Sequence, residues 1–145
     1  MGKFSGLGIN VSTGVKMTIL HPVTMEAIKD KDGKEAYLEL LSDDSRQALQ
    51  AVRKLSKKSF AKQRRRNDQK VEEAVDDLIE SQVEKIVSCL TGWYIVDFKG
   101  NPVDVPFSED SAREFLSDPE LAWVRNQALV FVADAGNFIK ASSPN

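Results

Sequence analysis

The stretch that most constrains the fold is residues 90–108, LTGWYIVDFKGNPVDVPFS, which separates two long helical patterns. Gly92 lies where a helix that ends near Leu90 needs a residue in the left-handed conformation at its C-terminus. Gly100 and Pro102 favour a turn, because glycine adopts positive φ without strain and proline cannot continue a helix. The stretch therefore predicts a tight connector between two helices.

The connector carries side chains suited to hold its flanking helices in place. Burying a tryptophan removes roughly 150–250 Å² from water, so we expect Trp93 to lock the two helices together. A ligand pocket beneath Trp93 is the alternative, although no acids, bases or metal ligands cluster in this stretch. Ser108 is suited to cap the next helix, with Phe107 and Ala112 spaced as a hydrophobic staple.

The same part of the chain carries a series of short motifs that occur together in one family. LTGW is followed by a turn of the form hydrophobic-Asp-x-x-Gly-x-Pro-Val, by Pro-Phe-Ser and by the helical segment AREFL at residues 112–116. The series closes with Asp-x-x-Asn-Phe at residues 134–138. With these motifs, residues 17–140 resemble the tail assembly chaperones of long-tailed bacteriophages.

This resemblance implies a small, mainly helical and non-enzymatic protein. It implies that the chain binds the tape measure protein and helps the tail tube assemble around it. The major tail tube protein is a second candidate partner, and copies of the chain are expected to associate with one another. The family acts in the host cytoplasm during virion assembly, so we do not expect this chain in the mature virion.

The overall composition is that of an ordinary globular domain, with 41% hydrophobic and 29% charged residues. The length of 145 residues predicts one domain, which we place at residues 15–140. A net charge of −2 gives no case for a nucleic-acid or membrane partner, and no apolar run is long enough to span a bilayer. The single cysteine has no partner for a disulfide or a cysteine-based metal site, and we expect no cofactor.

The N-terminal third predicts a flexible arm followed by a small sheet. Half of residues 1–14 are Gly, Ser or Thr, which favours an arm without regular structure. Residues 15–20 alternate as a strand does, and DKDG at residues 30–33 favours a β-hairpin turn. We therefore predict an antiparallel element of two or three strands within residues 15–41. At the other end of the chain, residues 141–145 are expected to form a flexible tail.

The middle of the chain predicts two long helices of opposite charge. Ser42 is a natural N-cap for the first, and residues 53–66 contain eight basic residues, with Arg64, Arg65 and Arg66 as candidate partner contacts. Nucleic-acid binding by this basic run is the alternative function, although Phe60 is its only aromatic residue. The second helix resumes at Val71 with acidic residues on its polar face.

The C-terminal part predicts a short helix after Ser108 and a longer one that restarts with Pro119 in its first turn. A stripe at helical spacing follows, formed by Leu121, Val124, Ala128, Phe131, Ala135 and Phe138. Core packing explains this stripe, and a partner-binding face is the alternative. The complete pattern predicts a mainly α protein of the α+β class, in which a small N-terminal antiparallel β element precedes a bundle of about four helices.

The sequence carries no motif for a recognised type of catalysis. It lacks a glycine-rich phosphate loop, a Gly-x-Ser-x-Gly motif and any cluster of His and Cys residues. Paired acids such as Asp43 and Asp44 are typical of helix surfaces and N-termini, although a site built only from carboxylates stays open. We therefore do not expect an enzyme.

Overall fold

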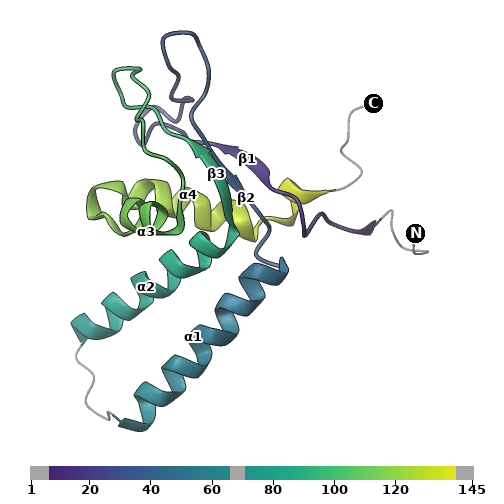
Figure 1. The fold of residues 1–145 in the computed structure, drawn as a ribbon, viewed down its shortest axis with the longest axis vertical. Helices are drawn as coiled ribbons and strands as arrows, with labels where there is room; N and C mark the ends of the chain where they lie inside the picture. Colours follow the sequence, from purple (N-terminus) through teal and green to yellow (C-terminus); the bar gives the residue numbers. More distant parts are fainter. Residues whose placement is uncertain (1–6, 66–70, 140–145) are drawn as a thin grey trace.

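A computed structural model describes residues 7–65 and 71–139 of the chain (Figure 1). Within them, three antiparallel strands and four α-helices confirm the α+β class. The elements follow in the order β1 Val15–Thr18, β2 Tyr37–Leu40, α1 Arg46–Arg65, α2 Val71–Cys89, β3 Leu90–Tyr94, α3 Glu109–Ser117, the 3₁₀ turn η2 Pro119–Leu121, α4 Ala122–Ala133 and the 3₁₀ turn η3 Ala135–Phe138.

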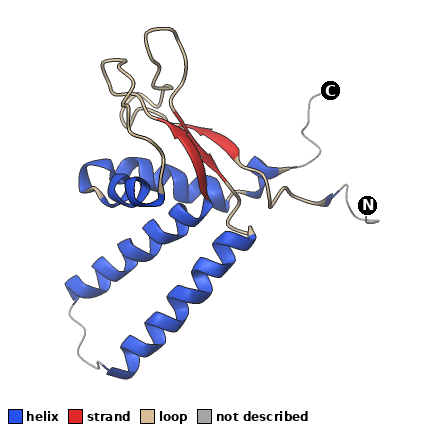
Figure 2. Ribbon diagram, in the orientation of Figure 1, coloured by secondary structure: helices blue, strands red, loops and turns tan. Residues whose placement is uncertain are grey.

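The sheet has the order β1-β2-β3, with β2 in the centre. Met17 of β1 lies opposite Leu38, which in turn lies opposite Trp93 of β3. Side chains alternate between the two faces of a strand, and Leu38 and Leu40 share the face that is fully buried. A small sheet needs such a cover to be stable, and α4 contacts β2 on this side of the molecule (Figure 2).

The DKDG turn forms as predicted, with Gly33 at φ 85° and Lys29 bridged to Glu35. The predicted N-terminal β element is therefore confirmed, with its third strand supplied by residues that follow α2.

The core lies where α2, α3 and α4 meet one another and the sheet. Fully buried apolar residues come from both layers of the fold: Leu38, Leu40, Ile86, Leu116, Val124, Ala128 and Val132.

Helices α1 and α2 pack antiparallel as a hairpin that projects from the sheet, as Figure 1 shows. The loops that follow β1 and β3 lie at the opposite end of the molecule. The C-terminal half of α2 enters the core through Val83 and Ile86. Its other half leaves apolar side chains accessible, with Val75 49% and Leu78 58% exposed. The apolar side of α2 is thus buried over only part of its length.

The first long helix begins one turn later than the sequence predicts. The Ser45 hydroxyl, rather than that of Ser42, accepts a hydrogen bond from the N–H of Ala48, at 3.3 Å. The N–H of Asp43 donates to the carbonyl oxygen of Val132 at 3.0 Å. Because this bond ties the preceding segment to the core, the chain turns once more before it becomes helical.

The prediction that Gly92 ends a helix in the left-handed conformation is wrong. Helix α2 ends at Cys89 and the chain passes directly into β3, where Gly92 pairs with Glu39 of β2. Among the described glycines, positive φ occurs at Gly33 and Gly100. The backbone groups that follow α2 pair with β2, so the helix needs no glycine cap to end.

The C-terminal helix is shorter than its stripe of apolar residues predicts. Helix α4 ends at Ala133, and Asp134 has the extended angles φ −92° and ψ 103°. The Asp134 carboxylate accepts a hydrogen bond from the N–H of Gly136 at 2.9 Å, which caps the 3₁₀ turn η3. A competing side-chain cap therefore interrupts the regular helical spacing before Phe138.

The described part of the predicted N-terminal arm lies against the domain. Ile9 forms an antiparallel bridge with Ile139, and the N–H of Asn10 donates to the carbonyl oxygen of Phe138 at 2.6 Å. Residues 7–14 thus contact the C-terminal segment, where the sequence predicts a free arm. Residues 1–6 of that arm and the predicted tail at 141–145 lie outside the described residues.

Candidate functional site

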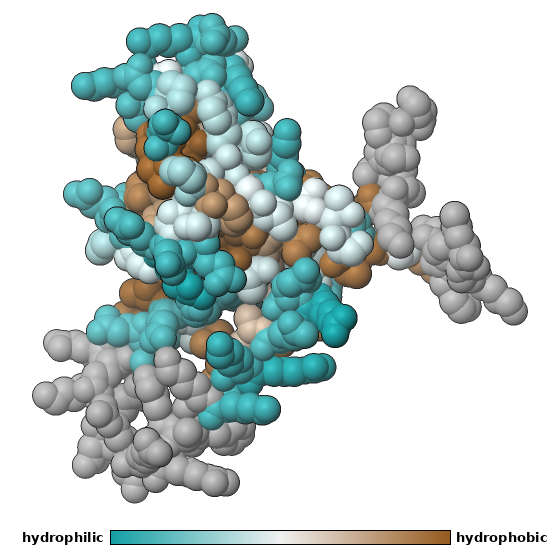
Figure 3. Space-filling view, viewed as in Figure 1, coloured by the Kyte–Doolittle hydropathy of each residue, from teal (hydrophilic) through white to brown (hydrophobic). Residues whose placement is uncertain are grey.

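A groove of about 520 Å³ opens between the connector that follows β3 and the helices α3 and α4. Figure 3 shows apolar atoms gathered on the viewed face where the loops meet the helices. We call this site the aromatic groove, and both tryptophans of the chain lie in its lining. Its apolar lining consists of Ile19, Ile28, Trp93, Ile95, Val96, Phe98, Val103, Val105, Phe115, Leu121, Trp123 and Val124.

A tight turn positions the outer wall of the groove. The Asp97 carboxylate accepts hydrogen bonds from the N–H groups of Lys99 and Asn101, both at 2.9 Å. Gly100 has φ 87°, as its predicted place in a turn requires. The turn presents Phe98 with 64% of its side chain exposed, so a large aromatic ring lies at the mouth of the groove.

Trp93 anchors the connector to the helical layer. Its indole N–H donates to the carbonyl oxygen of Val105 at 3.0 Å. Its ring lies 5.4 Å from that of Phe107 and 5.5 Å from that of Phe115, centroid to centroid. Edge-to-face and tilted pairs at such distances are favourable. Trp93 is half-buried, so it both holds the connector and presents apolar surface to the groove.

A second aromatic pair joins the turn to α4. The rings of Phe98 and Trp123 stack with centroids 5.8 Å apart and an interplanar angle of 25°. His21, from the loop after β1, places its ring 4.9 Å from that of Phe98. Three segments that are distant in sequence therefore meet at the mouth of the groove.

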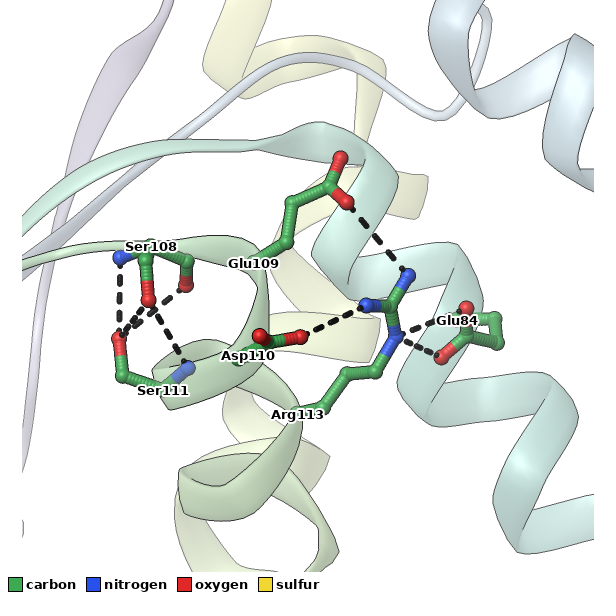
Figure 4. A network of polar contacts seen from close by, with 6 residues as sticks. All are labelled: Glu84, Ser108, Glu109, Asp110, Ser111 and Arg113. Atoms are coloured by element: carbon green, nitrogen blue, oxygen red, sulfur yellow. Dashed lines mark hydrogen bonds and ion pairs between the residues drawn. The ribbon is translucent and has the colours of Figure 1, made fainter.

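Helix α3, which contributes Ser111, Glu114 and Phe115 to the groove, is tied to the rest of the fold at both ends. Ser108 forms the predicted N-cap, and its hydroxyl accepts a hydrogen bond from the N–H of Ser111 at 3.1 Å (Figure 4). Arg113 binds Glu84 of α2 at 2.8 Å, also shown in Figure 4. At the C-terminal end, the buried Arg125 donates to the carbonyl oxygen of Leu116 at 2.9 Å.

The polar part of the lining is strongly acidic. Its charged residues are Asp97, Glu114, Asp118 and Glu120, and no basic residue among residues 7–65 and 71–139 lines the groove. The hydrogen bond from Asn101, together with that from Lys99, lowers the pKa of Asp97. The Asp118 carboxylate caps η2 by accepting from the N–H of Glu120 at 2.9 Å. The aromatic groove thus has a mainly apolar lining with four acidic residues, which we call the anionic rim and of which Glu114 and Glu120 are exposed.

The structure separates the predicted partner stripe into two groups. Leu121 and Val124 line the aromatic groove. Ala128 and Phe138 are buried in the core, and Phe131 is half-buried with its ring 5.6 Å from that of Phe138. Val124 is as buried as Ala128 and Phe138, so core packing explains these three residues. A partner-binding role for the stripe stays a prediction.

The basic run lies mainly on α1, which continues as a helix to Arg65. Arg53, Lys54 and Lys57 are exposed to solvent. Arg64 and Arg65 belong to the last turn of this helix, while Arg66 lies outside the described residues.

The sequence did not reveal the groove. Trp93 was recognised as a feature of the connector, but Trp123, Glu114 and Glu120 were given no role. The signal that could have found the site is the density of aromatic residues within 93–123, which is high for a chain with 8% aromatic residues. Their convergence depends on the packing of α3 and α4 against the connector.

The described part of the chain shows no metal site and no activated thiol. Within it, no group of three or more His, Cys, Asp or Glu residues could hold a metal ion. Burial raises the pKa of the Cys89 thiol, which keeps it in its protonated form. Among the described helices, none is both long and apolar enough to cross a membrane.

Comparisons with known proteins give no relative for this chain: no protein-family model matches it, and neither does any curated protein or solved structure. Its function must therefore be inferred from the aromatic groove and from the motifs of the sequence.

Proposed function

We propose that this chain is a non-catalytic tail assembly chaperone of a long-tailed bacteriophage, which binds the tape measure protein and promotes assembly of the tail tube. The observation that carries the proposal is the aromatic groove, an accessible and mainly apolar surface with two tryptophans in its lining. Accessible apolar patches on a folded domain mark interaction sites. The motif series that ends at residue 138 supports the same role.

The proposed client explains why such a surface is needed. A tape measure protein is expected to be long and helical, and to expose apolar stripes until the tube encloses it. Exposed stripes of this kind aggregate unless another molecule covers them. Several copies of the chain along one client would gain avidity from weak individual contacts, which is why self-association is part of the proposal.

The proposal also fixes where the protein acts. It works in the host cytoplasm while the tail forms, with the major tail tube protein as a second partner, and it leaves before the virion is complete. Mass spectrometry of purified virions should detect the tape measure protein and the tube protein but not this chain. Stoichiometric recovery of this chain from virions would make it a structural component instead.

Co-expression tests the central part of the proposal. The tape measure protein should be insoluble when expressed alone, and it should be soluble and co-purify when expressed with this chain. The proposal fails if the tape measure protein is equally soluble in both cases, or if the two proteins never co-purify.

A further inference from the structure

We propose that the aromatic groove holds one α-helix of its client, and that lysine or arginine residues flank the apolar face of that helix. The proposal rests on the proposed function, because it takes the groove to be the client site. It adds the secondary structure and the charge of the segment that is bound.

The backbone of the groove favours a helix over an extended strand. Strand addition requires free N–H and C=O groups along an edge. The N–H of Val103 donates to Ile95 at 2.9 Å, and the N–H of Val105 donates to Val103 at 3.0 Å. The carbonyl oxygen of Val105 accepts from the indole of Trp93. A helix pairs its own backbone groups, so it can dock through side chains alone.

The apolar lining supplies the contacts that such a helix needs. Phe98, Val103 and Val105 form one wall and are 64%, 41% and 45% exposed, so a bound helix would cover surface that now contacts water. The volume of about 520 Å³ lies within the range of roughly 300–1,000 Å³ that ligand pockets span. Apolar side chains spaced by three or four residues project from one face of a helix and can enter together.

The rim determines the charge of the client. Glu114 of α3 and Glu120 of η2 are both exposed, and within the described residues neither carboxylate has a salt bridge. Asp97 and Asp118 complete the anionic rim. Charge pairs at such exposed positions are individually weak, so they select and orient a basic client while the apolar lining provides most of the affinity.

Another copy of this chain carries a surface of similar chemistry, which makes it a competing occupant. On α1, the exposed apolar Leu49 and Val52 lie beside the basic Arg53 and Lys57. We assign the groove to the client, and peptide binding together with sedimentation distinguishes the client from a second copy of this chain.

Labelled helical peptides provide the test. One peptide carries a leucine and phenylalanine stripe flanked by lysine, and the second has the same stripe flanked by glutamate. A third has the composition of the first in a scrambled order without a stripe. By fluorescence anisotropy, we expect the lysine peptide to bind the full chain at least about tenfold more tightly than the other two, with a preference that weakens as salt rises.

Two charge-reversal variants locate the interaction. Glu114→Lys combined with Glu120→Lys should invert the preference between the lysine and glutamate peptides. The matched control, Asp76→Lys combined with Glu26→Lys, changes net charge equally at exposed positions outside the groove and should leave the preference intact. Circular dichroism of each variant checks that the fold is retained.

Several results would overturn the inference: equal affinity for the lysine and glutamate peptides, binding of the scrambled peptide, or an unchanged preference in the Glu114→Lys, Glu120→Lys variant. The groove would be assigned to a second copy if sedimentation showed an oligomer that this variant dissociates, and if the lysine peptide failed to compete with the second copy for the groove.

If the tape measure protein co-purifies with this variant as with wild type, the function stands and the charge rule fails. If the lysine peptide binds as expected but the tape measure protein never co-purifies, the function fails instead.

Discussion

Trp93 shows how one side chain joins stability to the candidate site. Because its indole is half-buried and hydrogen-bonded to Val105, we expect Trp93→Ala to lower the free energy of unfolding by about 2–4 kcal/mol, near the lower end of the range for aromatic truncation. Trp93→Phe keeps a ring and loses the hydrogen bond, so about 1 kcal/mol is expected. Chemical denaturation measures both, and a midpoint for Trp93→Ala equal to that of wild type would contradict this account.

A second residue pair predicts how stability depends on pH. The Tyr94 hydroxyl donates to the Asp30 carboxylate, which lowers the pKa of Asp30 and raises the pKa of Tyr94 to about 12. A lowered carboxyl pKa stabilises the fold above the unfolded value, and this contribution is lost as pH falls through the folded pKa. A raised phenol pKa stabilises the fold below the unfolded value of about 10, and this contribution is lost as pH rises towards 12.

Tyr94→Phe isolates this contribution. The difference in unfolding midpoint between wild type and Tyr94→Phe should be constant between about pH 5 and 9, and it should shrink below about pH 4 and above about pH 10. Denaturation series at five or more pH values measure it. A difference that does not change with pH would show that the hydrogen bond does not couple these two groups.

At the scale of elements, local patterns predicted the structure wherever local chemistry decides it. The turn at Gly33, the turn at Gly100 and the cap at Ser108 follow from residue types and spacing alone. Strand β3 could not be predicted in this way, because its identity depends on pairing with β2, which lies before α1 and α2. The aromatic groove has the same origin, since Phe98 and Trp123 meet only after α4 has packed.

The basic residues of helix α1 allow a prediction about nucleic-acid binding. Its basic run packs beside the acidic α2, so we expect DNA and RNA to bind no more tightly than the non-specific range of about 10⁻⁴ to 10⁻⁶ M. Anisotropy with labelled duplex and single strands at low and moderate salt measures this. Tight binding that falls about a thousandfold between roughly 50 and 200 mM salt, and that is lost on charge reversal of Arg64, Arg65 and Arg66, would make nucleic acid the partner.

On the scale of the whole molecule, the net charge of −2 is the sum of locally basic and locally acidic surfaces. The basic residues of α1 lie beside the acidic α2 on the hairpin that projects from the sheet (Figure 1). Four further acidic residues line the aromatic groove. The shared surface of the two tryptophans could not be predicted from the sequence, because their proximity depends on the complete fold. The proposed binding role therefore rests on the arrangement of residues that individually suggest only core packing.

The most direct measurement is the soluble fraction of the tape measure protein when it is co-expressed with groove variants. Phe98→Asp places a charge at the mouth of the groove, at a side chain exposed enough for the fold to tolerate it. Val130→Asp is the matched control, because Val130 of α4 is 71% exposed and does not line the groove. We predict a soluble, co-purifying tape measure protein with wild type and Val130→Asp, and an insoluble one with Phe98→Asp. Equal solubility with Phe98→Asp and wild type would contradict the assignment of the groove as the client site.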